Sequence, residues 1–549
     1  MSRPPRTLLH HARIHRGAAP GSPSGLEPAE AMLTEGDAVR WIGTQDQARE
    51  TLADMDAAAG DEVLDCEGAL VTPAFCDAHV HLTMTGQGLD GIDLSATASV
   101  TEALRLIESA ARHTRGRPIY AHSWDETRWV ERRAITAAEL DRATYGGVVS
   151  APRVDAHSAS VSSAMAAVAR VHGIDGWDGT GLVTRDAFAA VTGAFTAGMT
   201  PNDREHYLDL ALRAAAEKGV ALVHETGADH LTSFDDIHHV LQAGERPDRP
   251  RTVAYWGELV DNSERAAELH RHLGVRGLAG DLCADGSFGS WTAHLREPYL
   301  DESGSPSGEY GFGYLDSAQI RDHLVACTRA GLQGGGHVIG DAALATVIEG
   351  LRGAADIVGL EAFRAAGHRL EHVELADPSS LRVLAELGVW ASVQPAFDAI
   401  WGGTDGMYAA RLGRERALSV LPLRDMVRSG VRLAFGSDSP VTPLDPWGAV
   451  RAAATHHCAE QRLSVDEAFT AHTSAGYAMA GLEGGRLQAA GAATYVIWDH
   501  PEDPEPATTG EGVAALPRFE DAGAPAPMAR RTVIGGHVAF ERSEYGGTP

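Results

Sequence analysis

The sequence predicts an α/β protein: a closed (β/α)8 barrel, the TIM-barrel architecture, joined to a small β-sandwich that both chain ends form. Three observations predict this fold. Eight short apolar segments alternate with helical segments through the middle of the chain. Histidine and aspartate residues follow several of these apolar segments, and short strand-like segments occur at both ends. Such strand–helix alternation is typical of a parallel sheet closed into a barrel.

The size, charge and cysteine content of the chain exclude several classes of protein. At 549 residues it exceeds one ordinary domain, although a barrel with additions accounts for most of that length. The formal net charge of -29 repels phosphate backbones and anionic lipids, so we expect neither nucleic acid nor a membrane as partner. No signal peptide, no apolar run of about 18 residues and no Cys-x-x-Cys pair is visible, which predicts reduced thiols and a cytoplasmic location.

Short strands are predicted at both ends of the chain, in residues 1–72 and 484–549. They are Thr7–Ile14, Ala38–Ile42, Glu62–Leu64, Ala493–Trp498 and Arg531–Phe540. Gly535-Gly536 is a hairpin-turn signal inside the last of these, and residues 501–527 have the composition of an exposed loop. We therefore expect the two ends to pair into one β domain.

The barrel is predicted to occupy residues 73–483. Its strands are Ala74–His81, Val220–Glu225, Thr252–Trp256, Leu278–Asp285, Leu332–Ile339, His368–His372, Val389–Val393 and Arg432–Asp438. Helices are predicted between most of them, at Arg204–Lys218, Ser317–Ala330, Ala342–Leu351, Ser379–Leu387 and Arg424–Ser429.

One connection is too long for a simple barrel. Residues 83–217 separate the first strand from the second. Without that segment, residues 73–440 approach the length of about 250 residues that a simple barrel needs. Most of 83–217 is therefore predicted to be an insertion over the mouth of the barrel.

The first barrel strand ends in a His-x-His pair. Side chains alternate across a strand, so His79 and His81 are expected on one face and Val80 on the other. Two neutral imidazoles on one face suit zinc or a similar divalent metal. With 26 histidines in the chain, the pair alone is a weak signal, and the prediction depends on residues further along.

Other strands also end in polar residues, and the carboxyl ends of barrel strands meet in one pocket. The fourth strand carries Asp281, Cys283 and Asp285; the fifth ends at His337, the sixth at His372, and Asp438 follows the eighth. Each histidine alone is more simply explained as a hydrogen-bonded structural residue. Four histidines and an aspartate at strand ends that share a pocket predict a metal site.

The chain resembles the metal-dependent amidohydrolase superfamily, and within it the branch that includes N-substituted formamide deformylases. The motifs that carry the resemblance are Pro73–His81, Ala284–Ser290, His337–Asp341, Arg369–His372, Val393–Pro395 and Phe435–Pro446. The resemblance covers nearly the whole length. It implies a barrel plus a β-sandwich from both chain ends, a small-molecule substrate, and a homodimer as a common oligomeric state.

The resemblance also implies roles for individual residues. His79 and His81 would bind the more buried metal, His337 and His372 would bind a second metal or complete a single site, and Asp438 would touch both the metal and the attacking water. Many members place a metal-bridging lysine where this chain has Asp281. Because an aspartate has a much shorter side chain, we expect one tightly held Zn2+ with a weak or absent second ion. Whether Cys283, a soft ligand on the same strand, also binds is left open.

The implied reaction is hydrolysis of a non-peptide carbon–nitrogen bond. A bound divalent metal lowers the pKa of water toward about 7 and polarises the substrate carbonyl. Asp438 is placed to take a proton from water and return it to the leaving amine. The simpler alternative for Asp438 is to cap the helix that follows its loop.

Four further residues are substrate-binding candidates. Trp124 lies in the inserted segment and could pack on an apolar substituent; Asp155 and His157, also inserted, could hydrogen-bond to substrate. Asp285 belongs to a motif of the branch. For each, a purely structural role is an equal alternative, and for Asp285 that role is shaping a turn.

Other functions stay open at this point. A cyclic amide or ester hydrolase, or a deaminase on the same barrel, is the nearest alternative, although His337 lacks the glutamate three residues later that adenosine-type deaminases carry. A non-catalytic scaffold is a remote alternative, because such relatives usually lose the metal ligands. The sequence does not identify the substrate.

Overall fold

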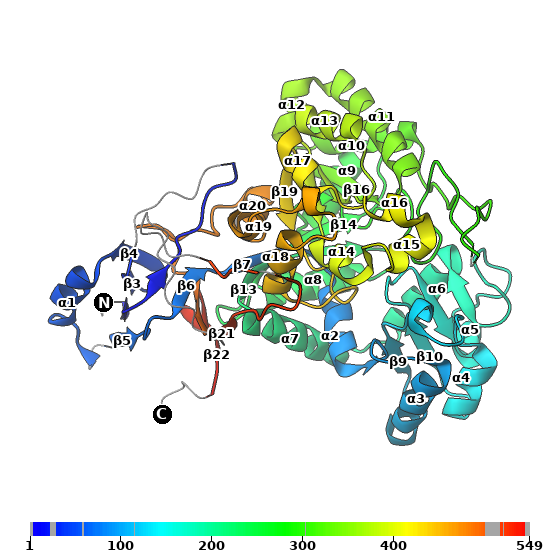
Figure 1. Ribbon diagram of the computed structural model, residues 1–549, viewed down its shortest axis with the longest axis horizontal. Helices are drawn as coiled ribbons and strands as arrows, with labels where there is room; N and C mark the ends of the chain where they lie inside the picture. Colours follow the sequence, from blue (N-terminus) through cyan, green and yellow to red (C-terminus); the bar gives the residue numbers. More distant parts are fainter. Residues whose placement is uncertain are drawn as a thin grey trace.

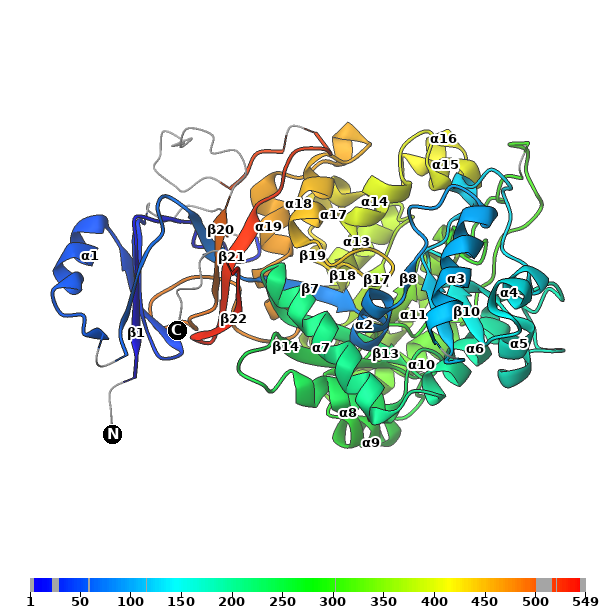
Figure 2. The same ribbon diagram turned by 90° about the horizontal axis from the view of Figure 1, so that it is seen from below.

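The computed structural model describes residues 4–21, 29–57, 60–114, 116–301, 303–499, 516–519 and 521–543. Much of the loop predicted at 501–527 lies outside these residues. In Figures 1 and 2 the N-terminal sheet and the segment inserted after the first barrel strand lie at opposite ends of the molecule, with the barrel between them.

An eight-stranded parallel sheet forms the centre of the molecule, as predicted. Its strands, from one edge to the other, are β19 (Arg432–Phe435), β18 (Trp390–Val393), β17 (Arg369–His372), β16 (Gln333–Val338), β15 (Gly277–Leu278), β14 (Arg251–Gly257), β13 (Val220–Ala228) and β7 (Phe75–Val80). The sheet curls into a nearly closed barrel because the segment after β19 hydrogen-bonds back to β7. The His81 amide donates to Ser439 O at 2.9 Å, and the Asp438 amide donates to His79 O at 2.7 Å. The last strand therefore meets the first where the His-x-His pair ends.

Strand β15 is shorter than predicted. The prediction extended it to Asp285, but the structure ends it at Leu278. Gly280 has a φ of +78°, a left-handed conformation that a strand cannot continue through. Asp281 and Cys283 consequently lie on an irregular segment, although Cys283 still forms one parallel bridge with His337.

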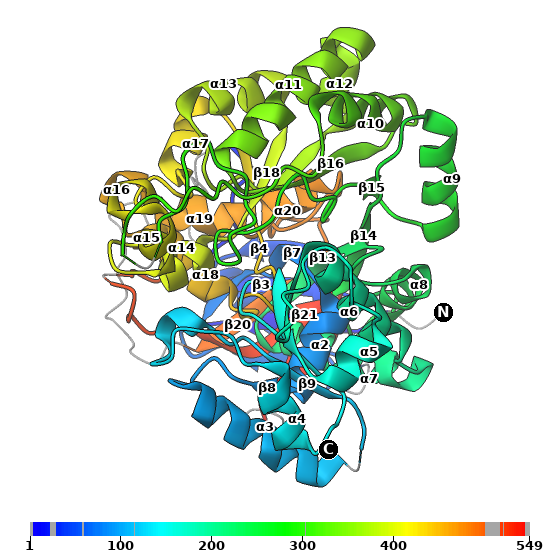
Figure 3. The same cartoon turned by 90° about the vertical axis from the view of Figure 1, so that its right-hand side faces the viewer.

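Helices between the strands cover the outside of the barrel (Figure 3). They include α7 (Pro201–Glu217), α8 (Phe234–Ala243), α9 (Ser263–Leu273), α10 (Ser317–Arg329), α11 (Asp341–Val358), α13 (Pro378–Leu387), α17 (Leu423–Ser429) and α18 (Pro446–Ala454). Each of the five predicted helices is present. Local sequence sets their starts: Thr200 and Asp203 form a capping box at α7, and Asp316 and Gln319 form one at α10. In the part of the chain that the structure describes, no helix has the length and apolar character needed to cross a bilayer.

The inserted segment has a sheet of its own. After α2 (Leu82–Asp90), five strands form in the order β12 (Leu182–Thr184), β11 (Ser158–Val161), β10 (Val149–Pro152), β9 (Ile119–His122) and β8 (Ile92–Asp93). The helices α3 (Val100–Thr114), α4 (Ala137–Thr144), α5 (Ser163–Val168) and α6 (Arg185–Ala197) accompany this sheet. Buried residues such as Ile107, Trp124, Trp129 and Leu140 give it a separate core.

The chain ends form two sheets. The first contains only N-terminal strands, in the order β4 (Ala38–Gly43), β3 (Ala31–Glu35), β1 (Arg6–His10) and β5 (Glu62–Asp65). The second combines both ends: β2 (Arg13–Ile14), β6 (Leu70–Pro73), β20 (Tyr495–Asp499), β21 (Met528–Ile534) and β22 (His537–Glu541). Leu9 and Met32 from the first sheet share one buried cluster with Val71, Tyr495 and Val533 from the second.

Two details differ from the prediction for the chain ends. The single strand predicted at Thr7–Ile14 is two strands in different sheets, because His11 between them has a φ of +50°. Strands β3 and β6 were not predicted. The Gly535-Gly536 turn is present between β21 and β22, with φ of +54° and +79°. The description of these parts as one sandwich domain stays a prediction.

Candidate metal centre

Six side chains converge at the carboxyl ends of the barrel strands. They are His79 on β7 and His81 directly after it, Asp281 after β15, His337 on β16, His372 at the end of β17 and Asp438 after β19. All six are buried. They form three overlapping triads in which the potential ligand atoms lie within 4.8 Å of one another: His79–His372–Asp438, His79–His81–Asp281 and Asp281–His337–His372. The structure therefore brings together every residue that the sequence nominated as a metal ligand.

The His-x-His pair faces two carboxylates. The Nε2 atom of His81 lies 3.1 Å from both Asp281 Oδ2 and Asp438 Oδ1. The Nε2 atom of His79 lies 3.3 Å from Asp438 Oδ1 and 3.7 Å from Asp281 Oδ1. The two imidazoles thus point at one carboxylate-lined space, as their shared strand face predicted.

The other two histidines also adjoin Asp281. The rings of His337 and His372 are 4.4 Å apart between centroids, and His337 Nδ1 is 3.9 Å from Asp281 Oδ1. Asp281 shares one triad with His79 and His81 and another with His337 and His372, so its carboxylate adjoins both histidine pairs. Cys283 is half-buried and lines the adjoining cavity, but it belongs to none of the described ligand triads.

Hydrogen bonds fix the orientation of three of the histidine rings. His79 Nδ1 lies 2.9 Å from Glu371 Oε2, His372 Nδ1 lies 2.8 Å from Gln394 Oε1, and His337 Nε2 lies 3.2 Å from Gly286 O. Each bond leaves the other ring nitrogen for the cluster, which is how metal-binding histidines are usually held. Glu371 and Gln394 were not assigned roles from the sequence. Glu371 directly precedes His372 in the motif Arg369–His372, and Gln394 lies in the motif Val393–Pro395.

Glu371 is itself held by a buried arginine. Arg369 Nε donates to Glu371 Oε1 at 2.6 Å, and Arg369 Nη2 donates to both Glu371 Oε2 at 2.9 Å and Ala78 O at 2.6 Å. Arg369 and Glu371 lie two residues apart on β17 and so share the strand face that points into the barrel. An arginine and a glutamate two residues apart within a predicted buried strand are the sequence signal from which this pair could have been predicted.

One buried nitrogen in the cluster has no hydrogen bond. His79 Nε2 is fully buried and unpartnered, although Asp438 Oδ1 is only 3.3 Å away. An imidazole whose Nδ1 is held by a carboxylate presents a lone pair at Nε2, the atom that binds a divalent metal. The donor set of four imidazoles and two carboxylates therefore fits a divalent cation.

Electrostatics in the cluster follow from its charges. Burial lowers the pKa of His81, but the Asp281 and Asp438 carboxylates outweigh that effect and raise its pKa to about 10. Burial, together with a neighbouring histidine in each case, lowers the pKa of His337 to about 4 and that of His372 to about 3. Burial opposes ionisation of Asp438, yet the adjacent His79 holds the pKa of that carboxyl well below its usual range. The two carboxylates thus favour a positive charge next to the His-x-His pair. Without a metal that charge is the proton on His81, and a divalent cation would supply it instead.

Three of the non-glycine residues with positive φ lie at or beside the cluster. His372, Val373 and Asp438 have φ of +69°, +50° and +55°. Non-glycine residues rarely adopt this conformation, and it occurs most often at functional sites where the surrounding structure enforces it. The strained backbone places both His372 and Asp438 at the cluster.

A cavity of about 290 Å³ opens onto the cluster. Its lining combines barrel residues with inserted residues: His81, Met84, Asp155, Ala156, His157, Arg185, Asp186, Phe188, Ala189, His230, Leu231, Asp281, Cys283, Tyr314, His337, His372, Asp438 and Val441. Two of the four predicted substrate-binding residues, Asp155 and His157, are among them. The His157 ring lies 5.1 Å from that of His337, and Asp155 accepts hydrogen bonds from Ser287 and Ser290 at 2.7 and 2.8 Å.

The other two candidates do not reach this cavity. Trp124 is buried in the core of the insertion, where it stacks on Trp129 and donates from Nε1 to Ala151 O at 2.6 Å. Asp285 is fully buried and accepts from the amides of Ile339 and Gly340, which ties its loop to the one after β16. The positions of Trp124 and Asp285 are consistent with the structural roles that were the alternatives to substrate binding.

Comparison with known proteins identifies the family. The pattern of the family described as "Amidohydrolase family" matches residues 62–540. This chain belongs to the amidohydrolase family. It is therefore a hydrolase that acts on carbon–nitrogen bonds, and the resemblance predicted from its motifs is confirmed.

Individual relatives agree with this assignment. The putative amidohydrolase YtcJ of Bacillus subtilis is 25% identical over 444 residues, covering 77% of this chain and 80% of the relative. The N-substituted formamide deformylase of Arthrobacter pascens is 25% identical over 528 residues, covering 88% and 92%. Among solved structures, an uncharacterized metal-dependent hydrolase from Pyrococcus furiosus is 25% identical with a TM-score of 0.68, covering 90% of this chain and 98% of that one.

Proposed function

We propose that this amidohydrolase cleaves a small N-acyl amine, with N-substituted formamides as its preferred class, in a metal-dependent reaction. The observation that carries the proposal is the position of Asp438. Its carboxylate lies within 3.3 Å of His79 and His81 and also lines the cavity. A single group therefore adjoins both the candidate metal ligands and the space where a substrate would bind.

The residues divide into holders of the metal and a carrier of protons. His79, His81, His337 and His372, with Asp281, would hold the metal, which when bound supplies Lewis acidity toward the carbonyl and toward water. Asp438 would accept the proton of the attacking water and deliver it to the amine nitrogen as the carbon–nitrogen bond breaks. The Glu371–Arg369 pair fixes the orientation of His79 throughout.

Two neighbouring cavities of different size support a small acyl group. A second cavity of about 20 Å³ shares His337, His372 and Asp438 with the large one, and Phe397, Trp401, Met407 and Tyr408 are among its other lining residues. Since a water needs about 10–15 Å³ by this measure, the space admits a hydrogen or a single small group. The large cavity, with Phe188, Leu231 and Val441 in its wall, would take the apolar substituent on nitrogen. The deformylase relative is consistent with this assignment.

We also propose the finer properties that accompany this function. The metal is Zn2+, because imidazole and carboxylate donors suit it, and one ion is held tightly because Asp281 replaces a longer residue. We place the protein in the cytoplasm as a homodimer, with a barrel at 73–483 that carries an insertion at about 83–217. The β-sandwich would comprise 1–72 and 484–549.

A substrate screen on zinc-loaded and chelated protein tests the proposal. It should include N-benzylformamide, the matching acetamide, a cyclic amide, an ester and an aminated ring. We expect turnover of the formamide that chelation abolishes and zinc restores. Turnover of the ester or the ring alone would favour an esterase or a deaminase on the same barrel, and no turnover of the formamide or the acetamide at full metal loading would overturn the proposed substrate class.

A further inference from the structure

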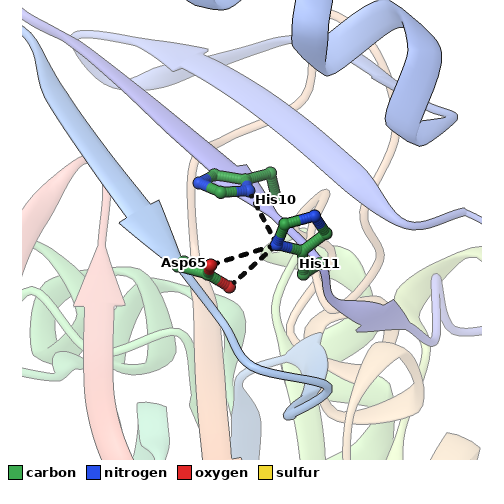
Figure 4. A group of neighbouring side chains, drawn as sticks. All are labelled: His10, His11 and Asp65. Carbon is green, nitrogen blue, oxygen red and sulfur yellow. Dashed lines mark hydrogen bonds and ion pairs between the residues drawn. The ribbon is translucent and has the colours of Figure 1, made fainter.

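A second cluster of potential metal ligands lies on the N-terminal sheet (Figure 4). Figure 2 shows that sheet at the opposite end of the molecule from the inserted segment. The cluster consists of His10, His11 and Asp65, whose potential ligand atoms all lie within 4.8 Å of one another. His10 is the last residue of β1, and Asp65 is the last residue of β5, directly opposite it in the parallel pair. We propose that these three side chains form a second site for a divalent transition metal such as Zn2+, separate from the metal centre of the barrel.

Local backbone geometry brings the two histidines together. Consecutive residues of a strand place their side chains on opposite faces. His11 has a φ of +50°, which ends the strand and leaves its ring 4.5 Å from the His10 ring between centroids. The turn is held by backbone hydrogen bonds: the Gly68 amide donates to His11 O at 2.7 Å, and the Cys66 amide donates to His10 O at 2.9 Å.

Further hydrogen bonds fix the surroundings of the cluster. The His11 amide donates to Gln45 Oε1 at 3.0 Å, and the Glu67 amide donates to Asp65 Oδ1 at 3.0 Å. The Asp65 carboxylate is therefore presented to the imidazoles from a fixed position.

Two-centre hydrogen bonds cannot satisfy every contact in this arrangement. His11 Nδ1 lies 3.1 Å from His10 Nδ1 and 3.0 and 3.1 Å from the two oxygens of Asp65 (Figure 4). If His11 Nδ1 carries the hydrogen and donates to Asp65, it has no lone pair to accept from His10. If instead His10 donates to His11, the lone pair of His11 faces a carboxylate. In either state one close contact lacks a two-centre hydrogen bond of its own.

A cation resolves both contacts at once. Ligand atoms about 2.1 Å from a tetrahedral zinc lie about 3.4 Å from one another, a few tenths of an ångström more than the 3.0–3.1 Å separations seen here. Two imidazoles and a carboxylate are ligands that Zn2+ accepts. The side chains of His11 and Asp65 are 51% and 50% exposed, so water has access to complete the coordination.

The test is a zinc titration of full-length protein prepared without a polyhistidine tag. Metal-depleted wild type is compared with His11→Asn and Asp65→Asn, with bound zinc measured by elemental analysis after equilibrium dialysis. Asparagine suits position 11 because it tolerates positive φ. His113→Gln, which changes an exposed histidine on α3, is the matched control.

We expect wild type and His113→Gln to bind one more zinc per chain than His11→Asn and Asp65→Asn. The zinc affinity of that additional step should fall at least tenfold in both variants. Equal zinc uptake by wild type and His11→Asn over the whole titration would overturn the proposal. The readout is a difference between variants, so it holds whether the barrel binds one ion, two or none. Amide hydrolysis by His11→Asn should equal that of wild type, which separates this site from the proposed catalytic function.

Discussion

The Nδ1 atom of His79 lies 2.9 Å from Glu371 Oε2, and both residues are fully buried. This bond directs His79 Nε2 toward Asp438 and joins the first barrel strand to the sixth. Removing the carboxylate charge should lower the metal affinity of the site by about 10–100-fold, the usual effect of losing a hydrogen-bond partner of a metal ligand. The measurement is competition for Zn2+ against a chromophoric chelator with Glu371→Gln.

Glu349→Gln, on the exposed side of α11, is the control for that variant. Because Arg369 would keep a buried charge without its carboxylate partner, Glu371→Gln should also unfold more easily, by about 3–5 kcal/mol. Zinc affinity is therefore to be measured on folded protein at low temperature. A variant with unchanged zinc affinity would show that Glu371 only supports the barrel.

Asp438→Asn should keep its metal and lose most of its activity. The change preserves shape but removes the group that accepts and returns the proton, which typically contributes about 10²–10⁴-fold to rate. The measurements are kcat on the best formamide and zinc content by elemental analysis. Activity near that of wild type would exclude Asp438 as the proton carrier and leave it as a structural residue.

The barrel should hold one tightly bound ion. The His11→Asn variant is the protein in which to count it, because that variant lacks the proposed surface site. After dialysis against a weak chelator, we expect about one zinc per chain, since Asp281 supplies a short carboxylate between the two histidine pairs. Two ions per chain at full occupancy would contradict the single-ion proposal.

Enlarging the small cavity should broaden the acyl group that is accepted. Met407 lines this cavity and is not one of the candidate metal ligands. In Met407→Ala, kcat/KM for the acetamide relative to the formamide should rise by about tenfold, because one methylene in a fitted pocket corresponds to about 10–200-fold. Met84→Ala, in the wall of the large cavity, is the control and should leave that ratio unchanged.

Acid should destabilise the fold through a buried histidine outside the site. His323 accepts from the Val260 amide at Nδ1 and bonds to Leu278 O through Nε2, so the neutral ring is satisfied. Burial lowers its pKa to about 4, whereas the unfolded value is about 6.5. The unfolded chain therefore binds more protons, and the stabilisation present above about pH 6.5 is lost as the pH falls toward 4.

Urea unfolding at pH 7 and pH 5 measures this effect. Going from pH 7 to pH 5, the free energy of unfolding should decrease for both proteins. The decrease should be roughly 2 kcal/mol smaller in His323→Gln than in wild type. His113→Gln should follow wild type. Equal pH dependence in His323→Gln and wild type would mean that His323 is not the group responsible.

Much of the fold followed from the sequence because barrel strands and helices are marked by apolar segments of characteristic length. Strand β15 was overextended because alternation continues beyond Gly280, whose positive φ leaves no mark on the pattern. In the insertion, the sequence shows strand-like runs before Ala121 and at Gly147–Pro152, where β9 and β10 lie, but the five-stranded sheet was not predicted, since its strands are only two to four residues long.

The candidate ligands were predictable because strand ends in a barrel converge whatever lies between them. Glu371 and Gln394 were not, because their roles depend on which neighbouring strand each side chain faces. Trp124 shows a related limit. An aromatic residue of the insertion can face the cavity or the core of its own segment, and only the packing of Trp129 and Ala151 against it decides between them.

The seam between the first and last barrel strands has a consequence for how the enzyme acquires its ion. His79 and Asp438 are brought within reach only when the Asp438 and His81 amides bond across that seam. A nascent polypeptide still lacking its final strand holds the His-x-His pair but not its carboxylate neighbour. We therefore expect metal binding at full strength only after the barrel has closed, and an ion held between His79 and Asp438 would oppose opening of the seam.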